Sequence, residues 1–324
     1  MFKLRIVTFP SDGSYIEGFP VPLPNLVVAG VRKSATTSLF HYLSQHPQIC
    51  ACRVKEPSYF TPLKYGKNLA DIQEYADLFA HCNGQPFRLE ASPGYFSGGA
   101  TIANPLVETL SKPHVVVILR NPIETCWSNY NFLRSRLKID KQMSFTQYID
   151  ECNRLHQLDE DDRFENRDFN SIRVSMYYRF VPIWSNLLGD RFKVILFDEF
   201  KNDSKAVVSQ LCDWLQIDSA PVDRIDFSVE NKTEQYRLRW MQQLALWTNR
   251  TWKPFFRRNH RLKKMLRKAY YVVNKDSGDK MQLLESDRER LGQIFAEPNA
   301  RLAEQLQQSG VQRLPSWLSN TSQV

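Results

Sequence analysis

One stretch of the sequence combines the residue types that bind phosphate-like anions. It follows a short apolar run at 26–29 that is typical of a buried strand. A loop between a strand and a helix leaves the first amide groups of the helix unpaired, so they can donate to an anion. Basic side chains add full charges and hydroxyls add donors. The stretch reads Gly30-Val31-Arg32-Lys33-Ser34-Ala35-Thr36-Thr37-Ser38.

This loop is not a Walker A motif, which requires G-x-x-x-x-G-K-S/T. No Gly-Lys pair in the chain follows another Gly at that spacing, and the apolar run at 115–119 leads into Arg120 rather than into an acidic residue for Mg²⁺. A metal-dependent nucleotide kinase of related fold is therefore disfavoured and is kept as an alternative.

A second anion-binding pattern begins at Arg120. Asn121, Pro122 and Glu124 form a helix-start signal, with Asn as the N-cap, Pro at the first helical position and Glu as the capping-box partner. Arg120 then stands at the carboxyl end of a strand, where open α/β sheets bind ligands. Ser128 follows about two turns into the helix and leans back toward its start. Arg120 and Ser128 can thus converge on one phosphate.

Together these motifs resemble those of the sulfotransferases that use 3′-phosphoadenosine 5′-phosphosulfate (PAPS). The first is similar to the family's phosphosulfate loop, R/P-K-S/G-G-T-T/S, with Ala35 where the family usually has Gly. A positive φ there would strain Ala35, whereas a first helical residue would suit it; we favour the second reading. The other motif matches R-x-P-x(5)-S-x-Y, with Tyr130 as its last residue.

The resemblance implies PAPS as sulfuryl donor and 3′-phosphoadenosine 5′-phosphate (PAP) as product, with no metal. Lys33 would act in catalysis by neutralising charge on the leaving group. Lys232 and Arg237 lie where the family has a late loop that closes over the nucleotide. The residues expected to bind the nucleotide are Arg32, Lys33, Ser34, Ala35, Thr36, Thr37, Ser38, Arg120, Ser128, Lys232 and Arg237.

The acceptor side is indicated by two further segments. The run from Glu90 to Tyr95 resembles E-K/A-S/T-P-x-Y of the glycan-type and bacterial branch, which implies that Glu90 is the base; a structural carboxylate is the alternative. Lys55 and Glu56 begin a segment similar to K-E-P-x-x-F, so they are expected to border the acceptor together with Tyr95, unless they only shape a turn. The implied reaction is in-line sulfuryl transfer to a hydroxyl or amine, with a glycan or glycolipid as the first choice of acceptor.

Strands alternate with helices along the chain, which predicts an α/β fold. The resemblance implies a P-loop-type, three-layer fold with a central, mostly parallel sheet of about five strands flanked by helices. We expect strands at 26–29, 49–53, 87–90, 115–119 and 192–197, and helices at 36–45, 72–80, 122–136, 145–155, 174–188 and 204–215.

No Gly/Ser-rich or Pro-rich linker divides the chain, so we expect a single domain over 1–324, with its core at about 25–230. Residues 236–271 carry eleven Lys or Arg and no acidic residue. This basic aromatic flap, extending to about 275, would contact a membrane surface or an acidic glycan, or form a lid. A helical pair is expected within about 280–317, at 287–295 and 299–308.

Composition agrees with a folded protein that has anionic partners. Hydrophobic residues make up 42%, and the net charge of +8 attracts nucleotides, acidic glycans or anionic membranes. We expect no nucleic-acid partner. A non-catalytic protein that binds anionic ligands stays an alternative. The six Cys form no C-x-x-C pair, so we expect free, mostly buried thiols rather than a zinc site or a disulfide framework.

No run in the sequence resembles a signal peptide or a bilayer span, because Pro and Gly interrupt the apolar N-terminus. A complete chain would therefore be soluble and cytoplasmic. Four Asn-x-Ser/Thr sequons keep the lumen of the secretory pathway as the alternative for a fragment, at Asn202, Asn231, Asn249 and Asn320.

Overall fold

The computed structural model describes residues 15–16, 19–20, 22–228 and 282–319. The chain divides into two compact units. The first comprises Met1–Arg120, Tyr177–Val229 and Leu302–Ser316, and the second Asn121–Met176, Glu230–Arg301 and Trp317–Val324. The expectation of a single domain stays a prediction. The basic aromatic flap, Lys232 and Arg237 lie outside the described residues.

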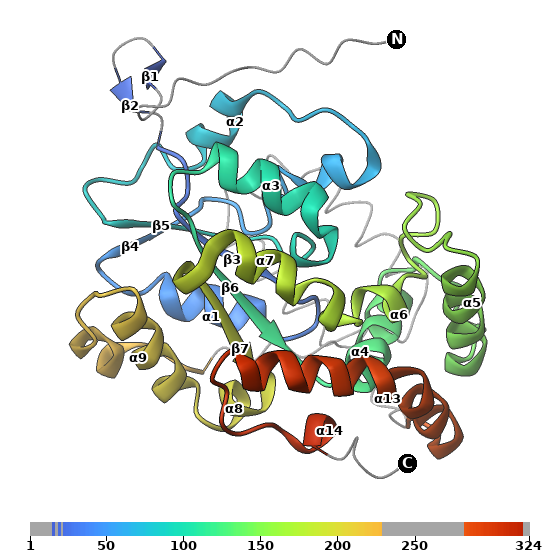
Figure 1. Cartoon of the computed structure of the whole chain (residues 1–324). Helices are drawn as coiled ribbons and strands as arrows, with labels where there is room; N and C mark the ends of the chain where they lie inside the picture. Colours follow the sequence, from blue (N-terminus) through green and yellow to red (C-terminus); the bar gives the residue numbers. More distant parts are fainter. Residues whose placement is uncertain (1–14, 17–18, 21, 229–281, 320–324) are drawn as a thin grey trace, which may run out of the picture. The chain divides into compact units, whose positions relative to one another are not determined.

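A five-stranded parallel sheet forms the centre of the first unit, in the order β4-β5-β3-β6-β7 (Figure 1). Every strand expected from the sequence is present. A separate antiparallel pair, β1 (Tyr15–Ile16) and β2 (Phe19–Pro20), precedes the sheet. The strands of the sheet are β3 (Leu26–Gly30), β4 (Ile49–Ala51), β5 (Phe87–Ala91), β6 (His114–Leu119) and β7 (Phe192–Leu196).

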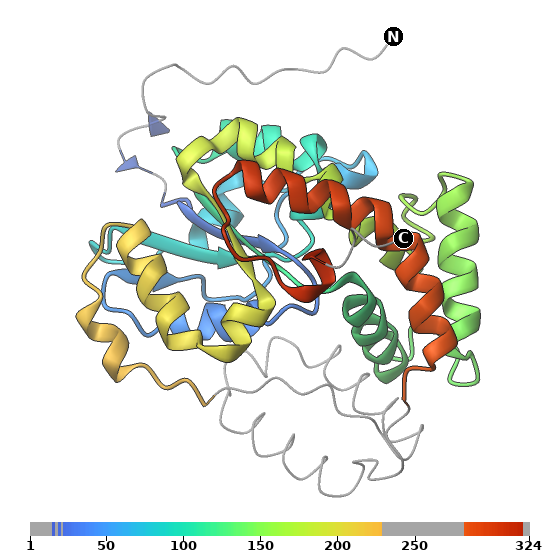
Figure 2. The ribbon, with the colours of Figure 1, turned by 60° about the horizontal axis from the view of Figure 1, so that its bottom comes forward.

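Helices cover both faces of this sheet, which confirms the expected three-layer α/β fold. Figures 1 and 2 show α1 and α9 on one face and α3 and α7 on the other. The helices of the first unit are α1 (Thr36–Leu43), α2 (Ile72–Asp77), α3 (Ala100–Thr109), α7 (Val181–Leu188), α8 (Phe197–Asn202) and α9 (Ser204–Trp214).

The second unit contains α4 (Pro122–Ser135), α5 (Phe145–Gln157) and α6 (Ser171–Val174). The units share α13 (Glu285–Gln308) and α14 (Ser316–Ser319). Short 3₁₀ turns complete the fold: η1 (Thr61–Tyr65), η2 (Phe96–Gly98), η3 (Tyr177–Arg179), η4 (Gly189–Arg191) and η5 (Ala220–Arg224).

The central strands are buried because their apolar runs are continuous. All five residues of β3 are buried, and so are the last five of β6. Such runs suit a parallel sheet covered on both faces. Leu39 and Leu43, one turn apart on α1, join Leu26 and Val28 in the core beneath the sheet. The phosphate-binding loop therefore leaves the most buried strand of the sheet.

Proline explains one difference from the predicted helices. Of the helix expected at 174–188, only α7 is α-helical beyond Val174, where α6 ends; the 3₁₀ turn η3 lies between them, and α7 begins next to Pro182. A proline lacks the amide hydrogen that a helix interior needs but suits the first turn. The expectation of a C-terminal helical pair is also wrong, because α13 is one helix that runs through Pro298. Helix α3, which contains Pro105, lies where no helix is expected from the sequence.

The expectation for the cysteines is wrong at two positions. Cys50 in β4 and Cys82, after α2, form a disulfide with a Cα–Cα distance of 5.7 Å. They are 32 residues apart, so only the folded chain brings them together. The other four are buried free thiols, as expected: Cys52, Cys126, Cys152 and Cys212.

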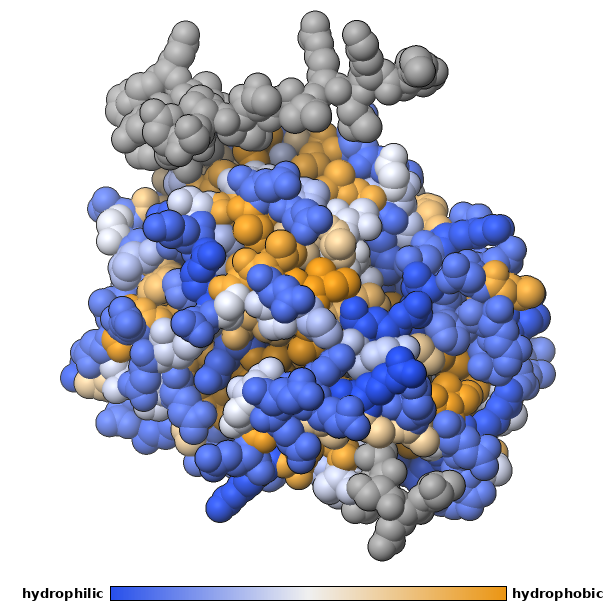
Figure 3. All heavy atoms as spheres, viewed as in Figure 1, coloured by the Kyte–Doolittle hydropathy of each residue, from blue (hydrophilic) through white to orange (hydrophobic). Residues whose placement is uncertain are grey.

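The described surface is largely hydrophilic on the face of Figure 3, with smaller hydrophobic areas between the polar residues. Among the described residues, the exposed large apolar side chains are Leu158, Phe164, Leu187 and Leu284. None of the helices in the described ranges combines the length and apolarity that a membrane span requires.

Gly30 is expected to be intolerant of any side chain. An added Cβ would lie 2.7 Å from Cβ of Phe96, so Gly30→Ala should lower the free energy of unfolding by about 1–3 kcal/mol through overpacking. Chemical denaturation measures this change. The control is Gly292→Ala in α13, where an added Cβ meets nothing within 4 Å, so that a small gain in stability is expected. Equal stability of Gly30→Ala and the wild type would contradict the packing argument.

Candidate functional site

The loop after β3 has an unusual backbone. Lys33 and Ala35 both adopt left-handed conformations, with φ of 66° and 57°. Ala35 is the N-cap of α1 rather than its first helical residue, so the reading favoured from the sequence is wrong. The backbone amide of Val31 donates to the carbonyl of Ile118 at 3.1 Å and ties the loop to β6. Because neither Lys33 nor Ala35 is a glycine, the surrounding structure must hold both residues in this conformation.

The loop leaves hydrogen-bond donors available to a ligand. Ala35 offers no side-chain cap to the first turn of α1, whose amides carry partial positive charge. Left-handed residues on either side of Ser34 turn successive amides into a concave arrangement of the kind that binds anions. The Ser34 hydroxyl is buried and has no hydrogen-bond partner among the described residues. A bound anion would satisfy these groups.

Arg120 connects the end of β6 to this loop. Its Nη1 donates to the Lys33 carbonyl at 2.8 Å, and its guanidinium lies 4.7 Å from the ring centroid of Phe197. The Tyr177 hydroxyl donates to the Arg120 carbonyl at 3.0 Å. Arg120 thus also fixes the backbone at Lys33, a role that its motif alone did not indicate.

Ser128 lies half-buried in α4 of the second unit. The start of α4 follows the sequence signal, because the Asn121 side chain accepts from the amide of Ile123 at 2.9 Å and Pro122 is the first helical residue. Glu124 forms an ion pair with Arg288 at 3.2 Å. The convergence of Arg120 and Ser128 on one phosphate stays a prediction.

Glu90, in β5, is completely buried. The Ser92 hydroxyl donates to its Oε2 at 3.3 Å, while Oε1 has no hydrogen-bond partner among the described residues. Burial raises the pKa of Glu90 from 4.5 to about 8, and the nearby hydroxyls of Tyr75, Ser92 and Tyr95 oppose that rise. The folded protein therefore holds Glu90 mainly protonated at neutral pH.

This burial predicts a pH-dependent stability. Folded Glu90 keeps its proton up to a pKa of about 8, whereas the unfolded side chain loses it near 4.5. The free energy of unfolding should therefore fall as the pH rises from about 5 to about 8. Glu90→Gln should flatten that profile in chemical denaturation, and the exposed Glu108→Gln on α3 should not. Parallel profiles of the wild type and Glu90→Gln would refute this assignment.

The segment that contains Lys55 and Glu56 packs against the end of β5. The amide of Glu56 donates to the Ala91 carbonyl at 3.1 Å, and the amide of Ser58 donates to the Ser92 hydroxyl at 3.0 Å. Glu56 and Ser58 both have positive φ, 61° and 57°. The side chain of Glu56 is 53% exposed and pairs with Lys55. Residues other than Gly that are held in left-handed conformations cluster at functional sites.

The hydroxyls of Tyr95 and Ser92 link this segment to the turn after β5. The Tyr95 hydroxyl is buried and accepts from the amide of Phe60 at 3.2 Å. An added Cβ at Gly94 would lie 3.3 Å from Nη2 of Arg32, so the exposed Arg32 reaches the same turn from the phosphate loop. The first unit thus joins the predicted loop to the predicted acceptor-side segments.

Three residues that lie next to predicted site residues were not themselves predicted. Tyr75 comes from α2 and faces Glu90, and Phe197 lies under Arg120. No local signal could have found either one, because both are distant in sequence from their partners. Ser92 could have been found, since it lies two residues after Glu90 on the same strand end.

Ala35→Gly is expected to raise the free energy of unfolding by about 1 kcal/mol, because a left-handed conformation is costly for any residue other than Gly. Ala206→Gly in α9 is the control and should lower stability by a similar amount, since its helix is right-handed. Chemical denaturation compares the two. A loss of stability in Ala35→Gly would contradict the strain assigned to Ala35.

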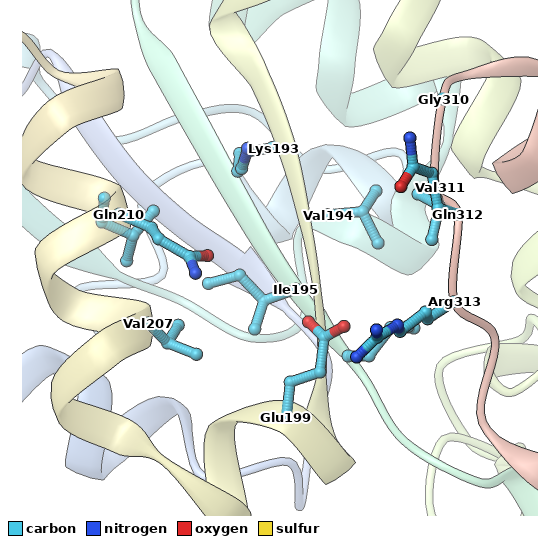
Figure 4. A pocket seen from close by; sticks show the side chains of 12 residues that line it. Lys193, Val194, Ile195, Glu199, Val207, Gln210, Gly310, Val311, Gln312 and Arg313 are labelled. Carbon is cyan, nitrogen blue, oxygen red and sulfur yellow. The ribbon is translucent and has the colours of Figure 1, made fainter.

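A separate pocket of about 440 Å³ lies beside β7 (Figure 4). Its walls come from β7, α8, α9 and the segment after α13, and none of the predicted site residues that the structure describes lines it. Its lining residues are Lys193, Val194, Ile195, Leu196, Glu199, Val207, Gln210, Leu211, Gly310, Val311, Gln312 and Arg313.

Comparisons with known proteins agree with the resemblance. Residues 23–288 match the model of the sulfotransferase domain. Membrane-associated sulfotransferase kil1 of Dictyostelium discoideum is 34% identical over 126 residues, which are 39% of this chain and 26% of that protein. Human heparan sulfate glucosamine 3-O-sulfotransferase 3B1 is 30% identical over 109 residues, 33% of this chain and 26% of that protein. The matches therefore span about a quarter of each relative's length.

A solved structure shows the same fold. The sulfotransferase from Alicyclobacillus acidocaldarius superposes with a TM-score of 0.65 at 23% identity, over 91% of this chain and 98% of that one. The family model covers most of the chain, including the phosphate-binding loop, β5 and the Arg120 motif. The chain belongs to the sulfotransferase domain family.

Proposed function

We propose that the chain transfers a sulfuryl group from PAPS to a hydroxyl or amine of an acceptor. The observation that carries the proposal is the loop after β3, where the buried Ser34 hydroxyl has no partner among the described residues and lies between two left-handed residues. These donors suit the phosphosulfate. Membership of the sulfotransferase domain family supports the same choice of donor.

The loop would position the donor and stabilise the leaving group. Amides at the start of α1 and the hydroxyls of Ser34 and Thr36 would donate to the phosphosulfate oxygens. Lys33 would neutralise the charge that develops on the oxygen bridging phosphorus and sulfur. Arg120 holds the Lys33 carbonyl and so fixes the loop for this task.

The reaction is an in-line displacement at sulfur. The acceptor oxygen or nitrogen bonds to sulfur as the bond from sulfur to the bridging oxygen breaks, and PAP leaves with that electron pair. A carboxylate takes the acceptor proton. Catalysis of this kind relies on positioning and charge stabilisation.

Two carboxylates are candidates for the base, Glu90 and Glu56. A general base must lie within hydrogen-bond reach of the acceptor. Glu90 is fully buried, whereas the side chain of Glu56 is 53% exposed beside Lys55. We assign the proton transfer to Glu56 and keep Glu90, the base predicted from its motif, as the second candidate. In this scheme Glu90 would have a structural role, as a buried side chain beside Tyr75 and Tyr95.

A carbohydrate is the acceptor class that we propose. The human relative is named for the glucosamine of heparan sulfate. The paired Lys55 and Glu56 offer a donor and an acceptor of hydrogen bonds to sugar hydroxyls at one place. PAPS turnover with glucosamine-containing oligosaccharides, compared with a simple phenol, tests this choice.

The donor proposal is tested by calorimetric titration with PAP in the absence of Mg²⁺. Micromolar binding is expected for the wild type. Binding should weaken at least tenfold in Arg120→Ala and remain in Arg224→Ala, a matched change of an exposed Arg in η5. Absent binding of PAP, or binding of ATP that requires Mg²⁺, would overturn the proposal and favour a nucleotide kinase.

A further inference from the structure

We propose that Cys50, His81 and Cys82 form a metal site of the zinc class when their disulfide is reduced. The three ligand atoms lie within 4.8 Å of one another. The chain between Cys50 and Cys82 would then be closed by a disulfide under oxidising conditions and by a bound metal under reducing ones. The proposal concerns a structural site and is independent of the proposed sulfuryl transfer.

The distances suit a tetrahedral site. Nε2 of His81 lies 3.5 Å from Sγ of Cys50. Zn–N bonds of about 2.0–2.1 Å and a Zn–S bond of about 2.3 Å place the two ligand atoms about 3.5 Å apart in tetrahedral geometry. Reduction frees the two sulfurs to separate to the corresponding distance of about 3.8 Å. The imidazole already lies where the metal needs it.

The surroundings leave room for a metal ion to enter. Cys50 is buried on β4, Cys82 is half-buried and His81 is exposed, so a water molecule can take the fourth position. Nε2 of His81 lies 3.1 Å from the Ala51 carbonyl. The metal would replace that contact and bind the neutral imidazole.

The chemistry balances with a dithiol as the reductant. The dithiol gives two electrons and two protons, becomes a disulfide, and leaves Cys50 and Cys82 as thiols. Zn²⁺ then binds both sulfurs as thiolates, and two protons are released. The oxidised chain keeps only the imidazole, so it should not retain the metal.

Closure of this segment matters because of the residues it contains. The chain between Cys50 and Cys82 includes Glu56, which donates to the Ala91 carbonyl, and Tyr75, which faces Glu90. Either crosslink ties the far end of the segment to β4, beside β5. The arrangement would then persist in compartments of either redox state, in contrast to that of a chain that depends on its disulfide.

Cobalt binding to the full chain tests the proposal. Reduced wild type should take up one Co²⁺ per chain, with thiolate charge-transfer and tetrahedral absorption bands that one equivalent of Zn²⁺ abolishes. Oxidised wild type should show neither band. His81→Ala should weaken Zn²⁺ affinity at least about tenfold, while His41→Ala, at an exposed His of α1, should leave it unchanged.

Cys82→Ser should lose the charge-transfer bands, and Cys212→Ser should retain them. His81 is exposed, so its variant is expected to fold even where Cys82→Ser does not, and circular dichroism checks both. Reduced wild type without these bands, or affinities of His81→Ala and Cys82→Ser equal to that of the wild type, would overturn the site.

Discussion

Lys33→Ala is expected to lower kcat for sulfuryl transfer by about 10³-fold. Removing one preorganised group that stabilises developing charge typically costs that much. Alanine adopts the positive φ of Lys33 at a similar cost, so the substitution removes the charge without adding backbone strain. Initial rates with PAPS and a saturating acceptor measure the change. PAP affinity should fall by a smaller factor, because the loop amides remain.

Lys201→Ala is the matched control for this variant. Lys201 is an exposed cation of α8 that belongs to no predicted site, so its loss should change kcat by less than about twofold. Lys33→Arg tests whether charge alone suffices, since the guanidinium is larger and differently shaped. A Lys33→Ala enzyme with wild-type kcat would show that Lys33 does not stabilise the leaving group.

Glu56→Gln is expected to lower kcat by about 10²–10⁴-fold, the usual contribution of a general base. Gln keeps the size of the side chain and cannot accept the acceptor's proton. Calorimetry should find PAP affinity unchanged, because Glu56 belongs to the acceptor side. Glu90→Gln should keep kcat within about tenfold of the wild type, since the buried Glu90 does not contact the acceptor in this proposal.

A large loss of kcat in Glu90→Gln, with little change in Glu56→Gln, would instead assign the base to Glu90, as its motif predicts. Glu74→Gln, on the exposed surface of α2 within the same disulfide-closed segment, controls for a general effect of removing a carboxylate there. Loss of kcat in both Glu56→Gln and Glu90→Gln, with Glu74→Gln unaffected, would mean that proton transfer depends on both carboxylates.

Local signals were sufficient for much of the fold and for the location of the loop. Apolar runs at 26–29 and 115–119 predicted the central strands β3 and β6, because a strand buried on both faces needs apolar residues throughout. Asn121 and Pro122 predicted the start of α4 to the residue, since a cap acts on amides within its own turn. These features depend on residues that are close together in the sequence, so they can be predicted from it.

Features that depend on partners distant in sequence could not be predicted in the same way. The helix expected at 174–188 is divided, and no local pattern revealed α3. Cys50 and Cys82 bond across 32 residues, and spacing alone suggested free thiols. The local sequence suited a right-handed Ala35, but the loop geometry requires the left-handed conformation.

The sequence by itself determined the family resemblance, the parallel sheet and the residues of the phosphate-binding loop. Only the tertiary structure decided the environments of the two carboxylates. Glu90 and Glu56 both belong to motif segments, yet one is enclosed by β5, α2 and the following turn while the other remains exposed. Burial is the sum of contacts from several elements, so it sets the protonation and reach of a carboxylate only once the chain has folded.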